Sequence, residues 1–151
     1  MNLTASLAIA ISAAFNVTPA QMPPLPTPMP QAQTVKEYVQ EYFADEPILV
    51  DIAQCESHMR QFDSNGSVLH GEVVYQDLGL MQVNETYHGA TAAKLGLDLY
   101  TMQGNLAYAR YLYDKEGTTP WNSSKACWSK SQDYKDAQAA TQTVVTINLN
   151  K

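Results

Sequence analysis

Positive charge is scarce in this chain, and no segment of it is strongly basic. The 151 residues include 9 lysines and arginines against 15 aspartates and glutamates, which gives a formal net charge of -6. Proteins that bind nucleic acids or anionic membranes concentrate lysine and arginine on one face, so neither partner is expected here. The negative net charge also offers no long-range attraction to an anionic substrate, which would have to be held by short-range contacts.

Cysteine is scarce as well, with 2 residues, while the hydrophobic fraction is 45%. Two cysteines are too few for a small fold held by several disulfides, and a chain of this length and composition can bury one core. We therefore expect a single domain with one site. His58, His70 and His88 do not have the spacing of metal ligands, so neither a metal nor another cofactor is expected.

Long hydrophobic runs are limited to the N-terminus. Residues 3–15 are apolar, and small residues follow at 18–21, as a leader-peptidase site requires. We expect residues 1–20 to be a secretion signal, although no lysine or arginine precedes the apolar run. The alternative is an N-terminal helix or a membrane tether, but the run is shorter than the roughly 20 residues of a spanning helix. An exported monomer without stable membrane insertion is the expected product.

Composition then divides the remaining chain into three parts. Residues 21–33 are rich in proline, which favours an extended linker that contributes nothing to a core. The folded domain is expected over residues 34–128. Residues 129–151 have no helical stripe and form a tail, and the β-branched run at its end is either an added strand or a frayed terminus.

Two helices are expected at the start of the domain. Thr34 and Glu37 have the spacing of a capping box, which predicts a helix start. Pro47 can begin a second helix, because the amide proton that proline lacks has no partner in the first turn. Glu56 lies at the end of this second helix. The apolar residues at helical spacing are Val35, Tyr38, Val39, Tyr42, Phe43, Ile48, Leu49, Ile52 and Ala53.

A small β-hairpin is expected after these helices. Residues 63–66 have turn chemistry, and two short β-branched pieces, 67–69 and 72–75, flank His70 and Gly71. More helix follows, with Asn84 as the N-cap of one helix that ends at Gly96. The sequence therefore predicts an α+β fold that is mainly α.

A last long helix is expected over residues 101–116. Leu99, Met102, Leu106, Ala109 and Tyr113 fall on one face of it, and Gly117 lies just beyond its end.

Glu56 is the residue best placed for acid chemistry. It follows an apolar helical stretch, where the helix gives way to the predicted hairpin, so its carboxyl group could face a cleft while its stem packs on the core. A carboxyl group donates a proton near neutral pH only if apolar surroundings raise its pKa. By position alone, however, a glutamate at a helix end is usually a solvated surface residue.

Glu56 becomes more informative together with two later segments. Cys55-Glu56-Ser57 is followed by the segment GLMQVN at 79–84 and then by the tyrosine-rich stretch NLAYARYLY at 105–113. In this order, and over residues 35–128, the sequence resembles the bacterial soluble lytic transglycosylase domain, a branch of the lysozyme-like superfamily. The resemblance implies a lysozyme-like fold with the hairpin beside an active-site cleft. It also implies a periplasmic, cell-wall-associated or extracellular protein whose partner is the glycan strands of peptidoglycan.

The resemblance also implies roles for individual residues. Glu56 would be the single catalytic acid and base that cleaves the β-1,4 bond between N-acetylmuramic acid and N-acetylglucosamine. It would first protonate the leaving oxygen and then, as a carboxylate, take the proton of the muramoyl C6 hydroxyl, which closes a 1,6-anhydro ring. Met81 and Gln82 would line the sugar cleft. The residues that would orient the glutamate or the sugar are Ser57, Asn84, Tyr108 and Tyr111, with Tyr113 as a further candidate.

The end of the domain departs from the family. The usual Ala-Tyr-Asn segment, whose tyrosine supports the glutamate, is absent in that form, so the supporting tyrosine is unassigned. Cys55 before the glutamate and Cys127 beside a tryptophan resemble the arrangement in resuscitation-promoting-factor-like domains. Two cysteines in an exported chain favour a disulfide, with two buried thiols as the alternative. Trp121 and Trp128 are expected in the core rather than as sugar platforms.

Two other functions stay open. In a hydrolytic muramidase, a second carboxylate would assist water, and Asp77, just before Gly79, is the best candidate, although a turn role is the simpler interpretation. In a non-catalytic peptidoglycan-binding module, the cleft would hold glycan without turnover.

Overall fold

The structure is a computed structural model that describes residues 24–28, 33–131 and 134–135. The expected leader, residues 1–20, and the β-branched run at the C-terminus lie outside the described residues. Within the described ranges, no helix is long and apolar enough to cross a membrane. The helices are α1 (Val35–Tyr42), α2 (Ile48–Ser57), α3 (Glu85–Lys94), α4 (Met102–Glu116), the 3-10 helix η2 (Thr119–Ser124) and α5 (Lys125–Trp128), and the strands are β1 (Asp77–Leu78) and β2 (Val83–Asn84).

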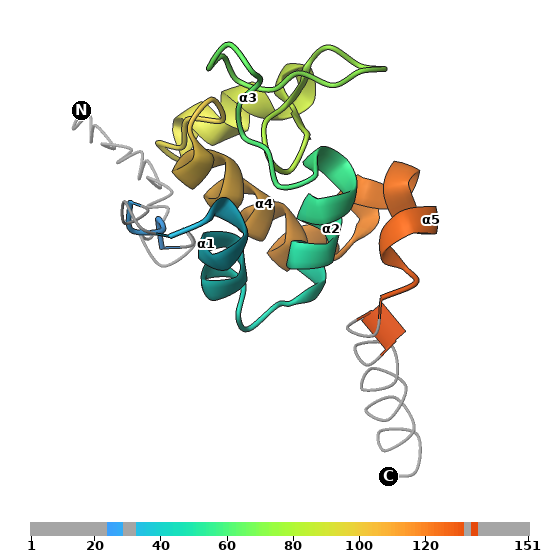
Figure 1. Cartoon of the computed structure of the whole chain (residues 1–151). Helices are drawn as coiled ribbons and strands as arrows, with labels where there is room; N and C mark the ends of the chain where they lie inside the picture. Colours follow the sequence, from blue (N-terminus) through green and yellow to red (C-terminus); the bar gives the residue numbers. More distant parts are fainter. Residues whose placement is uncertain (1–23, 29–32, 132–133, 136–151) are drawn as a thin grey trace, which may run out of the picture.

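The described part is therefore mainly helical with one small antiparallel sheet, which confirms the prediction of a mainly α chain with a small β component. In Figure 1, α4 runs through the middle of the molecule, α3 and the loops between α2 and α3 lie at the top, and α5 lies on the right. One hydrophobic core joins these elements. The largest fully buried side chains are those of Trp128, Tyr108, Phe43, Leu49, Ile52, Leu78, Leu80, Met81, Leu106, Val39, Asn105 and Ser57.

Both predicted helices at the start of the domain are confirmed. The Thr34 hydroxyl accepts a hydrogen bond from the Glu37 amide at 3.2 Å, and the Glu37 carboxylate accepts one from the Thr34 amide at 2.9 Å. Pro47 is the N-cap of α2, and the predicted apolar stripe of this helix is buried. Glu56 lies in the last turn of α2, as predicted.

The later helices also begin and end where the sequence predicts. The Asn84 side chain accepts a hydrogen bond from the Tyr87 amide at 3.3 Å and caps α3, and Thr101 caps α4 in the same way. Gly96 has φ 71° and Gly117 has φ 60°, conformations that glycine adopts without steric strain beyond a helix end.

The hairpin was predicted at the wrong residues. Asp77 pairs with Asn84 and Leu78 with Val83, so the two strands flank the turn at 79–82. The pieces 67–69 and 72–75 contribute only isolated bridges or none, and the Val73 side chain is 97% exposed. β-branched composition favours a strand but does not choose its partner. Burial distinguishes the second piece from the observed strands, because Val73, Val74 and Tyr75 are exposed whereas Leu78 and Val83 lie in the core.

Two buried amide side chains hold the turn at 79–82. Gln61 accepts a hydrogen bond from the Leu80 amide at 2.9 Å, and Asn105 accepts one from the Met81 amide at 2.9 Å. Asn105 also donates to the Leu78 carbonyl oxygen at 2.9 Å. A side chain at Gly79 would place its Cβ 2.5 Å from the Gln61 amide oxygen, so only glycine fits. The turn that carries Gln82 is thus fixed from within the core.

The Cys55–Cys127 disulfide joins the end of α2 to α5 and confirms the prediction of a disulfide. The Cα atoms of the two cysteines are 6.0 Å apart. Trp121 and Trp128 are buried, as expected for core residues, and the Trp128 indole donates to the Trp121 carbonyl oxygen at 2.9 Å. The disulfide and the two tryptophans together fix η2 and α5 against the end of α2.

Candidate functional site

Glu56 lies where two hollows of the surface meet. One has a volume of about 590 Å³ and the other of about 470 Å³. The hollows therefore extend from Glu56 in two directions, and we call them together the Glu56 cleft. The residues that line both hollows are Glu56, Val74, Asp77, Gln82 and Ser123.

The surroundings of the Glu56 carboxyl group favour its protonated form. Burial raises the pKa of Glu56, the Ser124 hydroxyl lowers it by a hydrogen bond, and the nearby negative charge of Asp77 raises it again, with a net upward shift. The Ser124 hydroxyl donates to Glu56 Oε1 at 2.6 Å. A carboxyl group that keeps its proton at higher pH than an exposed glutamate is suited to general acid catalysis.

Ser124 can serve both protonation states of Glu56. Its hydroxyl oxygen lies 2.6 Å from Glu56 Oε1 and 3.1 Å from the Trp121 carbonyl oxygen. A hydroxyl group has one proton, so it donates to one of these acceptors at a time. When Glu56 is ionised, Ser124 donates to it. When Glu56 is protonated, the carboxylic acid can donate to Ser124, whose own proton then turns to Trp121.

We predict that Ser124→Ala raises the pKa of Glu56, because the hydrogen bond that favours the carboxylate is lost while burial and Asp77 remain. The titration is measured from the side-chain carboxyl ¹³C shifts of labelled protein. Ser123→Ala is the matched control, since Ser123 lines the same cleft without a hydrogen bond to Glu56 among the contacts described. An unchanged or lowered pKa in Ser124→Ala would contradict the role given to Ser124.

Asp77 and Asn84 form one lip of the Glu56 cleft. They are directly opposite each other in the β1–β2 pair, and the Asn84 amide donates to Asp77 Oδ1 at 2.7 Å. This contact holds the Asp77 carboxylate in place beside the cleft. Asp77 is therefore a strand residue with a carboxyl group in the site, not only a residue of a turn.

Gln82 is held in an uncommon backbone conformation at the same lip. Its φ is 48°, in the left-handed region that non-glycine residues seldom adopt. Its side-chain amide donates to the Gly79 carbonyl oxygen at 2.8 Å, which fixes its direction. Of the residues predicted to bind substrate, Gln82 and Asn84 line the cleft with Glu56.

The side chains of three residues predicted to bind or orient the substrate are buried. The exposed fraction is 0% for Met81, 2% for Ser57 and 1% for Tyr108. The Ser57 hydroxyl donates to the Ala53 carbonyl oxygen at 3.2 Å within α2 and accepts from the Arg60 amide at 3.1 Å. None of these three side chains lines the Glu56 cleft.

The tyrosines of α4 do not contact Glu56 in the described structure. The Tyr108 hydroxyl lies 3.2 Å from His88 Nδ1, and the Tyr111 ring packs on the Tyr108 ring with centroids 5.4 Å apart. Burial raises the pKa of Tyr113 to about 12. None of the three lines either hollow at Glu56. The side-chain hydrogen bond to Glu56 in the described structure comes from Ser124.

Sequence reasoning missed Ser124 and Tyr87. Ser124 is 68 residues from Glu56 in the chain and has no motif around it. Tyr87 lines the cleft and is among the exposed aromatic residues, a position in α3 that helical periodicity could have indicated. An exposed tyrosine beside a cleft offers an apolar ring face and a hydroxyl group to a ligand.

Comparisons with protein-family models, with curated proteins and with solved structures found no match to this chain. In the described ranges, no three histidine, cysteine, aspartate or glutamate residues lie together as a metal site requires. The chemistry of the site is therefore argued from the side chains of the Glu56 cleft.

Proposed function

We propose that this protein is a peptidoglycan lytic transglycosylase with a lysozyme-like fold, and that Glu56 is its catalytic acid and base. The observation that carries the proposal is the position of Glu56. Its carboxyl group is partly buried, has a raised pKa, and lies where two hollows meet, so that a chain of sugars could pass it with residues on both sides. The motif order around Glu56, Gln82 and α4 supports the same class of enzyme.

The reaction needs one carboxyl group and no water. Protonated Glu56 donates its proton to the glycosidic oxygen as the bond from this oxygen to muramoyl C1 breaks. The resulting carboxylate takes the proton of the muramoyl C6 hydroxyl, whose oxygen attacks C1 and closes the 1,6-anhydro ring. The enzyme ends with Glu56 protonated again. Ser124 donates to the carboxylate between the two steps, and the amide groups of Gln82 and Asn84 and the ring of Tyr87 are available to the sugars.

Mass analysis of the products tests this proposal directly. The full chain and its Glu56→Gln variant are incubated with purified peptidoglycan, and the released muropeptides are analysed. Anhydro-muramoyl ends made only by the wild type are the expected result. Fragments with reducing ends would instead indicate a hydrolytic muramidase. Binding of peptidoglycan by both proteins without release of fragments would indicate a binding module.

The hydrolytic muramidase is the second candidate because Asp77 lines both hollows with Glu56 and its charge contributes to the pKa of Glu56. A second carboxylate at this place could activate water or stabilise the positive charge of the transition state. In the transglycosylase, by contrast, Asp77 would act only on the pKa of Glu56.

The variant Asp77→Asn separates these two roles. It keeps the acceptor for Asn84 but removes a negative charge, so the pKa of Glu56 should fall and the alkaline limb of the pH–rate profile should move to lower pH. In a transglycosylase, activity at acidic pH should stay within about 10-fold of wild type, whereas a muramidase should lose about 10²–10⁴-fold at every pH. Asp114→Asn, outside the cleft, is the control.

A further inference from the structure

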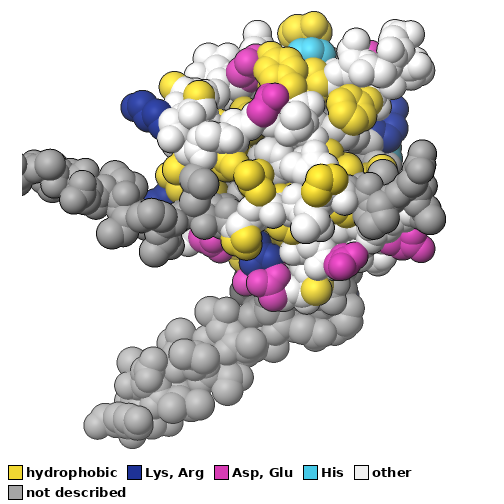
Figure 2. All heavy atoms as spheres, turned by 90° about the vertical axis from the view of Figure 1, so that its left-hand side faces the viewer, with side chains coloured by type: hydrophobic (Ala, Val, Ile, Leu, Met, Phe, Trp, Pro, Cys, Tyr) yellow, Lys and Arg dark blue, Asp and Glu magenta, His cyan; other side chains and the backbone are white. Residues whose placement is uncertain are grey.

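The face formed by α1 and α4 carries a third hollow, which shares no lining residue with the Glu56 cleft. Its volume is about 450 Å³. Figure 2 views this side of the molecule, where hydrophobic side chains reach the surface over much of the face and acidic side chains lie along its lower part. Its lining comes from Pro24, Pro26 and Thr27 and from Gln33, Tyr38, Glu41, Tyr42, Asp45, Arg110 and Asp114.

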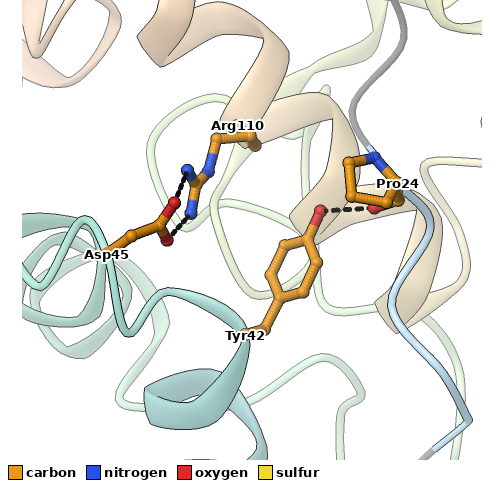
Figure 3. Close-up of polar contacts among 4 residues, drawn as sticks. All are labelled: Pro24, Tyr42, Asp45 and Arg110. Atoms are coloured by element: carbon orange, nitrogen blue, oxygen red, sulfur yellow. Dashed lines mark hydrogen bonds and ion pairs between the residues drawn. The ribbon is translucent and has the colours of Figure 1, made fainter.

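Residues 24–28 lie in contact with this face through two tyrosine hydroxyl groups. The Tyr42 hydroxyl donates to the Pro24 carbonyl oxygen at 3.0 Å, as Figure 3 shows, and the Tyr38 hydroxyl donates to the Thr27 carbonyl oxygen. Burial raises the pKa of Tyr42 to about 12, so this hydroxyl keeps its proton, and remains a donor, throughout the physiological pH range.

The two donors lie on one face of α1, and an extended proline-rich chain would present the two acceptors on one side. Polyproline II has three residues per turn, so the carbonyl groups of Pro24 and Thr27 point to the same side. Tyr38 and Tyr42 are four residues apart in α1 and lie on one face of this helix. Tyr42 binds the carbonyl group of Pro24, and Tyr38 binds that of Thr27. The segment therefore runs antiparallel to α1.

An ion pair fixes the end of the groove near Tyr42. Arg110 of α4 donates to Asp45 Oδ2 at 2.8 Å and forms a second bond to the other carboxylate oxygen (Figure 3). The guanidinium group also lies over the Phe43 ring, 5.6 Å from its centroid. Arg110 and Asp45 are thereby paired with each other, and Glu41 and Asp114 leave the lining with a net negative charge, so it does not attract an anionic peptide. Residues 21–33 contain no aspartate, glutamate, lysine or arginine.

We propose that this face is a recognition groove for an extended, uncharged proline-rich peptide. Residues 24–28 of the same chain are its resident ligand, and the groove accepts the same segment in trans once the resident is displaced. Aromatic-lined grooves bind such peptides because polyproline II is already extended and loses little conformational entropy on binding. Docking of this segment on α1 fixes the direction from which the chain enters the domain.

The test uses the full chain and a fluorescent synthetic peptide of residues 21–33. A variant in which Pro24, Pro26 and Pro28 are all changed to Ser weakens the resident ligand and should bind the peptide in fluorescence anisotropy. Wild type should bind it at least about 10-fold more weakly, because its own segment competes at an effective concentration near the millimolar range. A peptide of the same composition in scrambled order is the ligand control.

A second pair of substitutions tests the groove itself. Adding Tyr38→Phe and Tyr42→Phe to the serine variant removes two hydroxyl donors without changing the rings, and affinity should fall about 10-fold or more. Equal binding by the serine variant and wild type, equal binding of the scrambled peptide, or no loss with the phenylalanine pair would each overturn the proposal. In unaltered protein, nuclear Overhauser effects between the Tyr42 ring and Pro24 are expected, and their absence would overturn it whatever the fold of the variants.

Discussion

Replacement of Glu56 by glutamine is expected to lower the rate of peptidoglycan cleavage by at least about 10²–10⁴-fold. The amide has nearly the shape of the carboxyl group and can still accept the Ser124 hydrogen bond. It cannot donate a proton to a leaving oxygen or take one from the C6 hydroxyl, so both steps of the proposed reaction fail. The rate is measured as release of soluble muropeptides by the full chain.

The control for this variant is Glu41→Gln, which makes the same chemical change on an exposed carboxyl group of α1 outside the Glu56 cleft. It should retain wild-type activity. Peptidoglycan binding should persist in Glu56→Gln, because Gln82, Asn84 and Tyr87 are unchanged. Full activity in Glu56→Gln would exclude Glu56 as the catalytic acid.

The effect of Glu56→Gln on the free energy of unfolding has a predictable direction. It therefore distinguishes a variant that has lost catalysis from one that has lost its fold. The pKa of Glu56 is raised in the folded state, so the folded protein binds this proton more tightly than the unfolded chain does. Wild type therefore loses stability as pH rises from the unfolded to the folded pKa of Glu56. An amide has no such loss, so Glu56→Gln should be at least as stable as wild type at neutral pH. An inactive variant that is more stable has lost a catalytic group.

Signals within a few residues of each other predicted most of the helical fold. The capping box at Thr34, the N-cap at Asn84 and the glycines at 96 and 117 each satisfy backbone groups of adjacent residues, so the sequence alone identifies them. The strand pairing depends on which distant side chains share a core. For that reason composition placed the hairpin at 67–75, while burial of Leu78 and Val83 places it at 77–84.

The residues of the candidate site also fall into two groups, those that a local sequence pattern predicts and those that only tertiary packing brings to the site. A motif identified Glu56, Gln82 and Asn84, all of which line the cleft. The motif could not tell which way Met81 points, because side chains in a four-residue turn follow neither the strand nor the helix period. Ser124 reaches Glu56 through tertiary packing of η2 on α2, for which the sequence contains no local signal.

Loss of the Cys55–Cys127 disulfide is expected to lower the free energy of unfolding by about 4 kcal/mol, because the bond closes a long loop in the unfolded chain. The two cysteines are 72 residues apart. The variant in which both are changed to Ala is compared with wild type by urea unfolding, and reduced wild type should behave like the variant. A difference below about 1 kcal/mol would contradict the loop-entropy account.

The same bond has a second, separable effect on the site. Cys55 is adjacent to Glu56, and Cys127 lies on α5 shortly after Ser124, so the disulfide joins the two chain segments that carry Glu56 and its hydrogen-bond partner. If it acts only on the unfolded state, the folded double variant keeps the wild-type pKa of Glu56 and its activity in the absence of urea. If it also positions the segments, the Ser124 contact weakens, and the pKa of Glu56 rises as in Ser124→Ala. Carboxyl ¹³C titration of the folded variant therefore distinguishes a bond that limits the unfolded chain from one that also aligns Glu56 and Ser124.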